Sequence, residues 1–241
     1  MKLSLIYPVN PVFINQGFGD TTYLDFYKAN GLIFPGHNGI DFQASHGEPI
    51  YAAHDGGAYY ETDDKQGHGV VLISSDYYDY NGTQCKFKTI YWHMCDSTKE
   101  PKYTSPVEKY RDLNQAPLIV KQGDLIGYAD STGLSTGDHL HFGLKPVAVD
   151  EAPWTVSNIE AGNGYYGAID PKPFLPPLPD RYPAPPITPV VPSKPTELVI
   201  PTVSTSTPIF DLIEVSTVKV KKTWLSTVLD FILSLINAIL K

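Results

Sequence analysis

The sequence predicts an all-β domain, a mostly antiparallel sheet or sandwich, followed by a proline-rich linker and a C-terminal hydrophobic helix. Tyrosine and phenylalanine, which favour strands, are abundant, with 16 Tyr and 10 Phe among 241 residues. Short apolar runs alternate with Gly, Asn and Asp turns up to about residue 170. The 241 residues can form one well-packed domain with further segments attached.

Four apolar runs account for the predicted strands. They are GVVLIS at 69–74, CKFKTIYWHM at 85–94, DLIGYA at 124–129 and HLHFGL at 139–144. The segment YNGT at 80–83 carries an Asn-Gly pair between two such runs, which predicts a hairpin.

The composition changes along the chain and predicts a division into three segments. Residues 1–178 form the predicted domain and residues 179–206 the linker, because 11 of the 22 prolines lie in 171–195 and favour an extended polyproline-type chain. Residues 207–241 form a C-terminal segment with a helix at about 223–240.

The predicted helix is apolar around most of its circumference, with a polar stripe that includes Asp230. Eighteen residues span about 27 Å, slightly less than a ~30 Å hydrocarbon core, so a clean transmembrane span is not expected. The basic stretch VKVKK at 218–222 suits anionic lipid. Binding to a membrane surface and association with itself or a virion partner both stay open for residues 223–240.

Charge, cysteine content and the N-terminus restrict the function further. The net charge of -8 and the pI of about 5.3 argue against a nucleic-acid partner. Cys85 and Cys95 lie in one predicted strand, roughly 33 Å apart if it is straight, so no disulfide is expected between them. The apolar run before Pro8 is too short for a Sec signal peptide.

The segment STGDHLHFGL contains two histidines, His139 and His141, separated by Leu140. Residues two apart in a strand point to the same face, so both rings can reach one cavity while Leu140 enters the core. This pattern predicts a metal site that needs further ligands from elsewhere, and the spacing leaves open which histidine binds the metal.

The segment GHNGIDF supplies the best further ligands, His37 and Asp41. A straight strand would separate them by roughly 13 Å, so the chain must bend, which Gly39 permits. Imidazole and carboxylate groups are good zinc ligands, and a set of two His and one Asp would leave an open coordination position for catalysis.

His93, in the run IYWHM, is a further candidate. Strand alternation predicts that it faces the same side as Tyr91 and Cys95, opposite Trp92 and Met94, and forms a wall of the active site. The other three histidines lack such neighbours and are interpreted as loop histidines: His46, His54 and His68.

Several motifs together resemble the lysostaphin/LytM-type zinc metalloendopeptidases. The resemblance covers roughly residues 5–178 and is carried, in the family's order, by GHNGIDF, GEPIYAAHDGGA, GHGVVLIS, IYWHM, VKQGDLIGYADSTGLSTGDHLHFGL and AIDPKPFL. It implies a mostly antiparallel β fold with a groove over the zinc. It implies one Zn²⁺ per domain, bound by His37, Asp41 and His141, and two unligated catalytic histidines, His93 and His139.

The family's substrate is the peptide part of bacterial peptidoglycan, cut in a cross-bridge, often Gly–Gly, or between D-Ala and a diamino acid. The sequence does not select between these bonds, and no HExxH motif is present. The enlarged stretch at 98–119 is expected to border the groove.

A wall substrate without a signal peptide predicts a phage or prophage protein. It would be made in the host cytoplasm and reach the wall after holin-type release or as part of a virion. Two alternatives are an inactive peptidase-like module that binds the wall and a structural virion protein that carries this domain.

Overall fold

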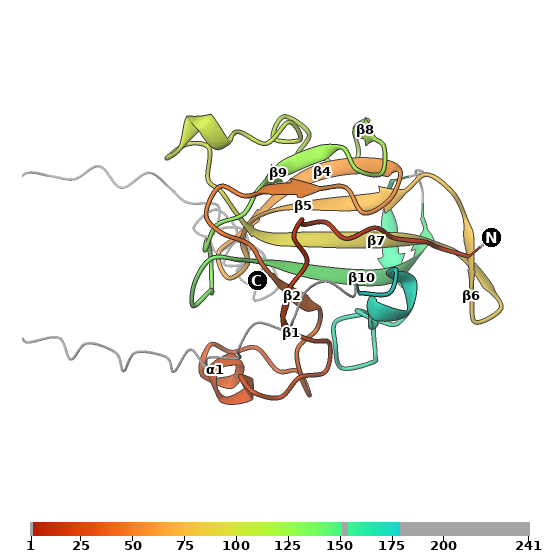
Figure 1. The fold of residues 1–241 in the computed structure, drawn as a ribbon. Helices are drawn as coiled ribbons and strands as arrows, with labels where there is room; N and C mark the ends of the chain where they lie inside the picture. Colours follow the sequence, from red (N-terminus) through yellow and green to blue (C-terminus); the bar gives the residue numbers. More distant parts are fainter. Residues whose placement is uncertain (1, 151–153, 179–241) are drawn as a thin grey trace, which may run out of the picture. The chain divides into compact units, whose positions relative to one another are not determined.

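The central feature of the computed structural model is a nine-stranded sheet in which all neighbouring strands are antiparallel (Figure 1). The structure describes residues 2–150 and 154–178. The main path of the sheet runs β1-β2-β10-β7-β5-β4-β8, with β11 added beside β10 and β6 beside β7. The strands of this sheet are β1 (Ile14–Gln16), β2 (Ile40–Gln43), β4 (Gly56–Asp63), β5 (Gly67–Ser74), β6 (Tyr78–Tyr80), β7 (Thr83–Met94), β8 (Leu118–Val120), β10 (His139–Val149) and β11 (Val156–Asn158).

A second, two-stranded sheet and three short helical segments complete the described elements. The small sheet pairs β3 (Pro49–Tyr51) with β9 (Leu125–Tyr128). The helical segments are α1 (Leu24–Ala29) and two 3-10 turns, Pro101–Tyr103 and Lys172–Phe174. No helix in residues 2–150 and 154–178 is long and apolar enough to cross a bilayer. The predicted linker at 179–206 and the predicted helix at 223–240 lie outside the described residues.

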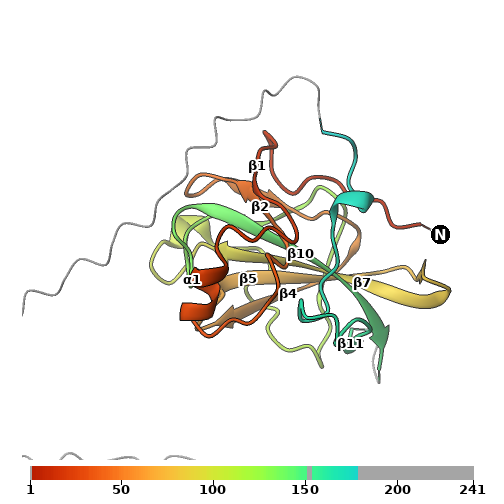
Figure 2. The same cartoon turned by 90° about the horizontal axis from the view of Figure 1, so that it is seen from below.

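The predicted all-β, antiparallel fold is confirmed, and each of the four predicted strands is present as β5, β7, β9 or β10. The predicted hairpin is also present and joins β6 to β7, which project together from the sheet (Figures 1 and 2). Its two turn residues have positive φ, 52° at Asn81 and 79° at Gly82, as a type I′ turn requires.

Both faces of the central sheet pack against side chains, and alternation along the strands separates the two sets. On β5, Val70 and Leu72 belong to the larger core, whereas Val71 and Ile73 belong to a smaller cluster. Besides these two residues, the smaller cluster contains Tyr59, Ile90 and Trp92. We call the surface that carries this smaller cluster the second face of the sheet.

The two cysteines are both buried and unpaired, although only Cys85 lies within a strand. Their separation along β7 keeps the two thiols apart, because Cys85 lies near its start and Cys95 directly follows its end.

Candidate metal centre

The pairing of β2 with β10 places two of the predicted ligands side by side. Asp41 and His141 lie directly opposite each other in this antiparallel pair. Leu140 is fully buried in the larger core, and strand alternation therefore turns His139 and His141 to the second face.

The third predicted ligand, His37, reaches the same point because the chain bends before β2. Bends occur at Asn38 and Gly39, and His37 Nε2 lies 3.1 Å from Asp41 Oδ1. A β-carbon at Gly39 would lie 2.6 Å from the carbonyl oxygen of Phe142 and 2.7 Å from Cε1 of His141. Glycine is therefore required at this bend by the close approach of these atoms.

The three side chains meet through one atom each. His141 Nδ1 lies 2.9 Å from His37 Nε2 and 3.0 Å from Asp41 Oδ1. A zinc ion bonded at ~2.0–2.2 Å to three donors requires them to be about 3–3.5 Å apart. Two nitrogens and one carboxylate oxygen at these separations fit such an ion, and three ligands would leave a coordination position open.

Residues outside the ligand set hold His37 in place. Its Nδ1–H donates to the carbonyl oxygen of Gly17 at 3.3 Å, which leaves Nε2 unprotonated for a metal. The ring of Tyr27, on α1, stacks on the imidazole with the centroids 6.4 Å apart. The hydroxyl of Tyr27 in turn donates to Oε1 of Gln16 at 3.1 Å.

The pKa shifts in the cluster favour an ionised carboxylate on Asp41 next to the imidazole rings. Burial would raise the pKa of Asp41, but the charge on His37 and hydrogen bonds from His141 and His37 hold it well below its usual value. Burial would lower the pKa of His37, but the Asp41 carboxylate raises it overall. The pKa of His141 is lowered, mainly by burial. A metal would bind both groups in their deprotonated forms, so its binding would release any proton held at Nε2 of His37.

The orientation predicted for His93 from strand alternation is wrong. Tyr91 and Met94 both lie in the larger core, so they do not face opposite sides, and His93 between them has a positive φ of 65°. This conformation, unusual for a non-glycine residue, breaks the alternation at the end of β7. It turns the His93 ring toward His139, with ring centroids 4.6 Å apart.

Two backbone carbonyls fix both of the predicted catalytic histidines. His93 Nδ1–H donates to the carbonyl of Thr132 at 2.7 Å, and His139 Nδ1–H donates to that of Gly137 at 2.8 Å. Each Nε2 is consequently free of a proton in the neutral ring, and His139 Nε2 lies 3.7 Å from Oδ2 of Asp41. Burial, with smaller contributions from His139 and His141, lowers the pKa of His93 to about 3, so its ring is neutral at pH 7.

A second group of side chains could also hold a metal by the separation of its donors: His46, Cys95 and Asp130. Here His46 lies between two carboxylates, 3.0 Å from Asp130 and 3.1 Å from Glu100. The buried thiol of Cys95 donates to the carbonyl of Ala129 at 3.1 Å, and burial raises its pKa to about 12. These contacts favour a charged histidine bridge over a thiolate ligand.

The remaining histidines have structural contacts. His54 is buried and bonded to Thr89 Oγ1 at 2.9 Å, and burial lowers its pKa to about 4. The interpretation of His68 as a loop histidine is wrong, because it lies in β5 and bonds the hydroxyl of Tyr60 at 2.9 Å.

Sequence reasoning missed the groups that orient the functional rings. The carbonyls of Gly17, Thr132 and Gly137 act through the backbone, which every residue type shares, so no side-chain pattern marks them. Tyr27 gives no signal either, because its proximity to His37 depends on where α1 packs.

Comparisons with known proteins match this part of the chain. Residues 35–153 match the family model described as Peptidase family M23. A protein from Haemophilus influenzae named "Uncharacterized metalloprotease" is 29% identical over 116 residues, which cover 48% of this chain and 20% of that protein. The chain therefore spans about a fifth of the length of the curated relative it matches.

Two solved structures are similar at low identity. The catalytic domain of the antimicrobial peptidase lysostaphin from Staphylococcus simulans is 23% identical with a TM-score of 0.45, covering 68% of this chain and 92% of that chain. A zinc containing peptidase from Vibrio cholerae is 24% identical with a TM-score of 0.42, covering 63% of this chain and 41% of that chain.

Proposed function

We propose that the chain, whose residues 35–153 match the model of peptidase family M23, is a zinc-dependent endopeptidase that hydrolyses peptide bonds in bacterial peptidoglycan. The observation that carries the proposal is the convergence of His37, Asp41 and His141 on one point, with the rings of His93 and His139 beside it. Three ligands with an open position are typical of catalytic rather than structural zinc.

The metal and the histidines would divide the chemistry. A bound zinc ion polarises the scissile carbonyl and lowers the pKa of the attacking water. Nε2 of His93 or of His139 can accept the proton of that water and return it to the leaving amine. Because Thr132 and Gly137 bond the opposite nitrogens, neither ring needs to rotate or change tautomer before it accepts the proton. The protonated ring can then stabilise the negative charge that develops on the carbonyl oxygen.

The direct test is digestion of purified cell walls, with and without a chelator, by the wild type, Asp41→Ala and an exposed control, Asp79→Ala. We expect wild type and control to hold about one zinc per chain and to release soluble fragments, and the chelator to abolish release. Asp41→Ala should lose both zinc and activity. A fully active Asp41→Ala protein would refute the assignment of the metal site, and an inactive wild type loaded with zinc would favour a peptidase-like binding module.

The assignment within the His139–His141 pair needs its own measurement, since the two residues share one strand face. Metal analysis of His139→Ala and His141→Ala should show zinc retained in the first and lost in the second. The opposite result would exchange the two roles.

We further propose that the chain serves a phage or prophage, acting on the wall after holin-type release or from a virion. The support is the composition after the catalytic domain, where a proline-rich segment precedes an apolar stretch at 223–240, as suits a catalytic module tethered to an anchoring one. Expression in a susceptible bacterium should cause lysis only when a holin is expressed with it. Rapid lysis by the chain alone would contradict this route.

A further inference from the structure

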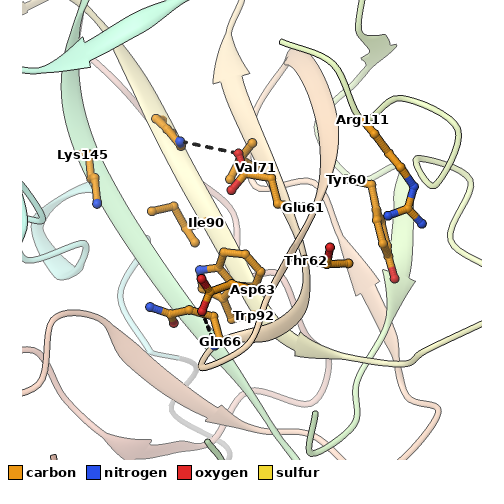
Figure 3. A pocket seen from close by; sticks show the side chains of 11 residues that line it. Tyr60, Glu61, Thr62, Asp63, Gln66, Val71, Ile90, Trp92, Arg111 and Lys145 are labelled. Atoms are coloured by element: carbon orange, nitrogen blue, oxygen red, sulfur yellow. Dashed lines mark hydrogen bonds and ion pairs between the residues drawn. The ribbon is translucent and has the colours of Figure 1, made fainter. Parts of the chain in front are cut away.

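A cavity of about 500 Å³ lies on the second face of the sheet, next to the metal centre. The register of β7 and β10 places the cavity beside the metal centre. Trp92, which lines the cavity, is directly opposite His141. Farther along the same strands Lys88 is opposite Lys145, and both lysines also line the cavity. Figure 3 shows Lys145 on β10, Ile90 and Trp92 on β7, and Glu61 on β4, which is separated from β7 by β5.

The floor of the cavity between the metal centre and the two lysines is formed by apolar side chains. Ile90 and Val71 form it together with Trp92, whose ring lies over Gly69, where a β-carbon would come within 2.3 Å of the indole. Gly143, between His141 and Lys145 on the same face, adds no side chain. The cavity therefore reaches from Trp92, beside the metal centre, to Lys145 with no β10 side chain between His141 and Lys145 on this face.

The far end of the cavity has an excess of positive charge. Lys88 Nζ is 3.9 Å from Oε1 of Glu61, at the limit of an ion pair. For the amine of Lys145, residues 2–150 and 154–178 provide no ion pair within 4.0 Å. Burial, and then the charge of Lys88, lower the pKa of Lys145 to about 8, which leaves the amine mostly protonated at pH 7. Two ammonium groups thus share one protein carboxylate.

The third cation that lines the cavity is engaged elsewhere. The guanidinium of Arg111 lies 4.5 Å from the centroid of the Tyr60 ring and donates to Oε1 of Glu108 at 3.3 Å. Arg111 belongs to the enlarged stretch at 98–119 and is the residue of that stretch that lines this cavity. Asp63, the other carboxylate that lines the cavity besides Glu61, accepts hydrogen bonds at Oδ1 from the backbone amides of Lys65 and Gln66. This leaves Lys145 and Lys88 as the lining cations that an anion in the cavity can pair with.

We propose that Lys145 and Lys88 form a carboxylate-binding subsite that selects peptide substrates with a free carboxylate a few residues from the cleaved bond. The inference rests on the proposed function of the metal centre. Residues 141 and 145 are four apart in one strand, roughly 13 Å, which corresponds to about four residues of an extended substrate. A stem peptide that contains a diamino acid carries such carboxylates, whereas a bridge made of glycine has none, so the subsite favours cleavage within acidic stems.

The test compares soluble peptidoglycan fragments that share the same D-Ala–diamino acid cross-link and differ only in whether the stem carboxyls are free or converted to carboxamides. Fragments with glycine bridges form a third substrate. The enzymes are the zinc-loaded full-length wild type, Lys145→Met, Lys145→Arg and a control at an exposed lysine outside the cavity, Lys172→Met. The readout is kcat/KM for each substrate, with products identified by mass spectrometry.

We expect the wild type and Lys172→Met to prefer the free carboxylates by about tenfold, the scale of one charged hydrogen bond. Lys145→Met should lose the preference through a fall in kcat/KM for the free-carboxylate fragments, and Lys145→Arg should keep it. Equal cleavage of the free-carboxylate and the amidated fragments by the wild type, preference for glycine bridges, or an unchanged preference in Lys145→Met would overturn the subsite. Failure of the wild type to cleave any of the three would instead refute the endopeptidase function.

Discussion

Replacement of Gly39 by alanine is predicted to disrupt the metal centre by adding a single methyl group. The new carbon would lie 2.6 Å from the Phe142 carbonyl oxygen and 2.7 Å and 2.9 Å from Cε1 and Nε2 of His141. Unstrained contacts between such atoms are about 3.5 Å, so the surroundings must move by roughly 0.8 Å. Because Phe142 pairs with Ile40 across β2 and β10, its carbonyl is held by the ladder and the imidazole is the more mobile group.

A displacement of this size exceeds what zinc ligation tolerates. Bond lengths in a functional site stay within about 0.2 Å of their usual values. The ring of His141 would move while its Nδ1 must stay about 3 Å from His37 and Asp41. We therefore expect zinc affinity to fall by about 10- to 100-fold, as for altered supporting groups of metal sites, and stability without metal to fall by about 1–3 kcal/mol from overpacking.

The matched control is Gly143→Ala, two residues beyond His141 in β10. Its methyl would meet Ile90 at 3.5 Å and 3.7 Å, which is ordinary contact. Competition titration with a chromophoric chelator measures zinc affinity, and thermal unfolding in EDTA measures stability without metal. We expect Gly143→Ala to bind zinc like the wild type. If Gly39→Ala also binds zinc as tightly as the wild type, the reasoning from close approach is refuted.

Three further predictions concern other parts of the domain. His93→Ala and His139→Ala should each retain zinc but lose about 10²-fold or more in kcat/KM, and loss of zinc by His93→Ala would contradict its unligated role. For His54 the folded pKa of about 4 lies below the usual 6.5, so the unfolded state binds more protons between these values. Stability should therefore fall by up to about 3 kcal/mol as the pH drops from 6.5 to 4, and equilibrium unfolding in EDTA should show a shallower pH dependence for His54→Asn. In the hairpin turn, Gly82→Ala should cost about 1 kcal/mol in urea unfolding because φ is 79°, whereas Gly162→Ala, with no atom within 4 Å and no positive φ, should be neutral.

The sequence predicted the features that depend on local pattern. The strands followed from apolar runs between turn residues, and the hairpin from Asn81-Gly82, because the two positive φ angles of its turn favour those residue types. The pair His139 and His141 on one face followed from strand alternation, with Leu140 turned into the core. The need for a bend between His37 and Asp41 followed from the length of extended chain between them, and the structure contains it.

Strand alternation could not predict the orientation of His93. Its positive φ is a local departure that the surrounding structure imposes, through the Thr132 carbonyl on its ring and the bridge between Met94 and Ala129. Strand alternation assumes a regular backbone at every residue, so it fails where one residue leaves the β region.

The sequence by itself determined the class of fold and the chemical types of the ligands, because both depend on residue identity and on spacing within single segments. Only the tertiary structure decided that Asp41 lies opposite His141 and that Lys88 lies opposite Lys145 on the same face of the sheet. These juxtapositions join residues 57 to 100 positions apart, and they are fixed by strand register. Register depends on which apolar faces pack together in the core, which no single segment of the sequence contains.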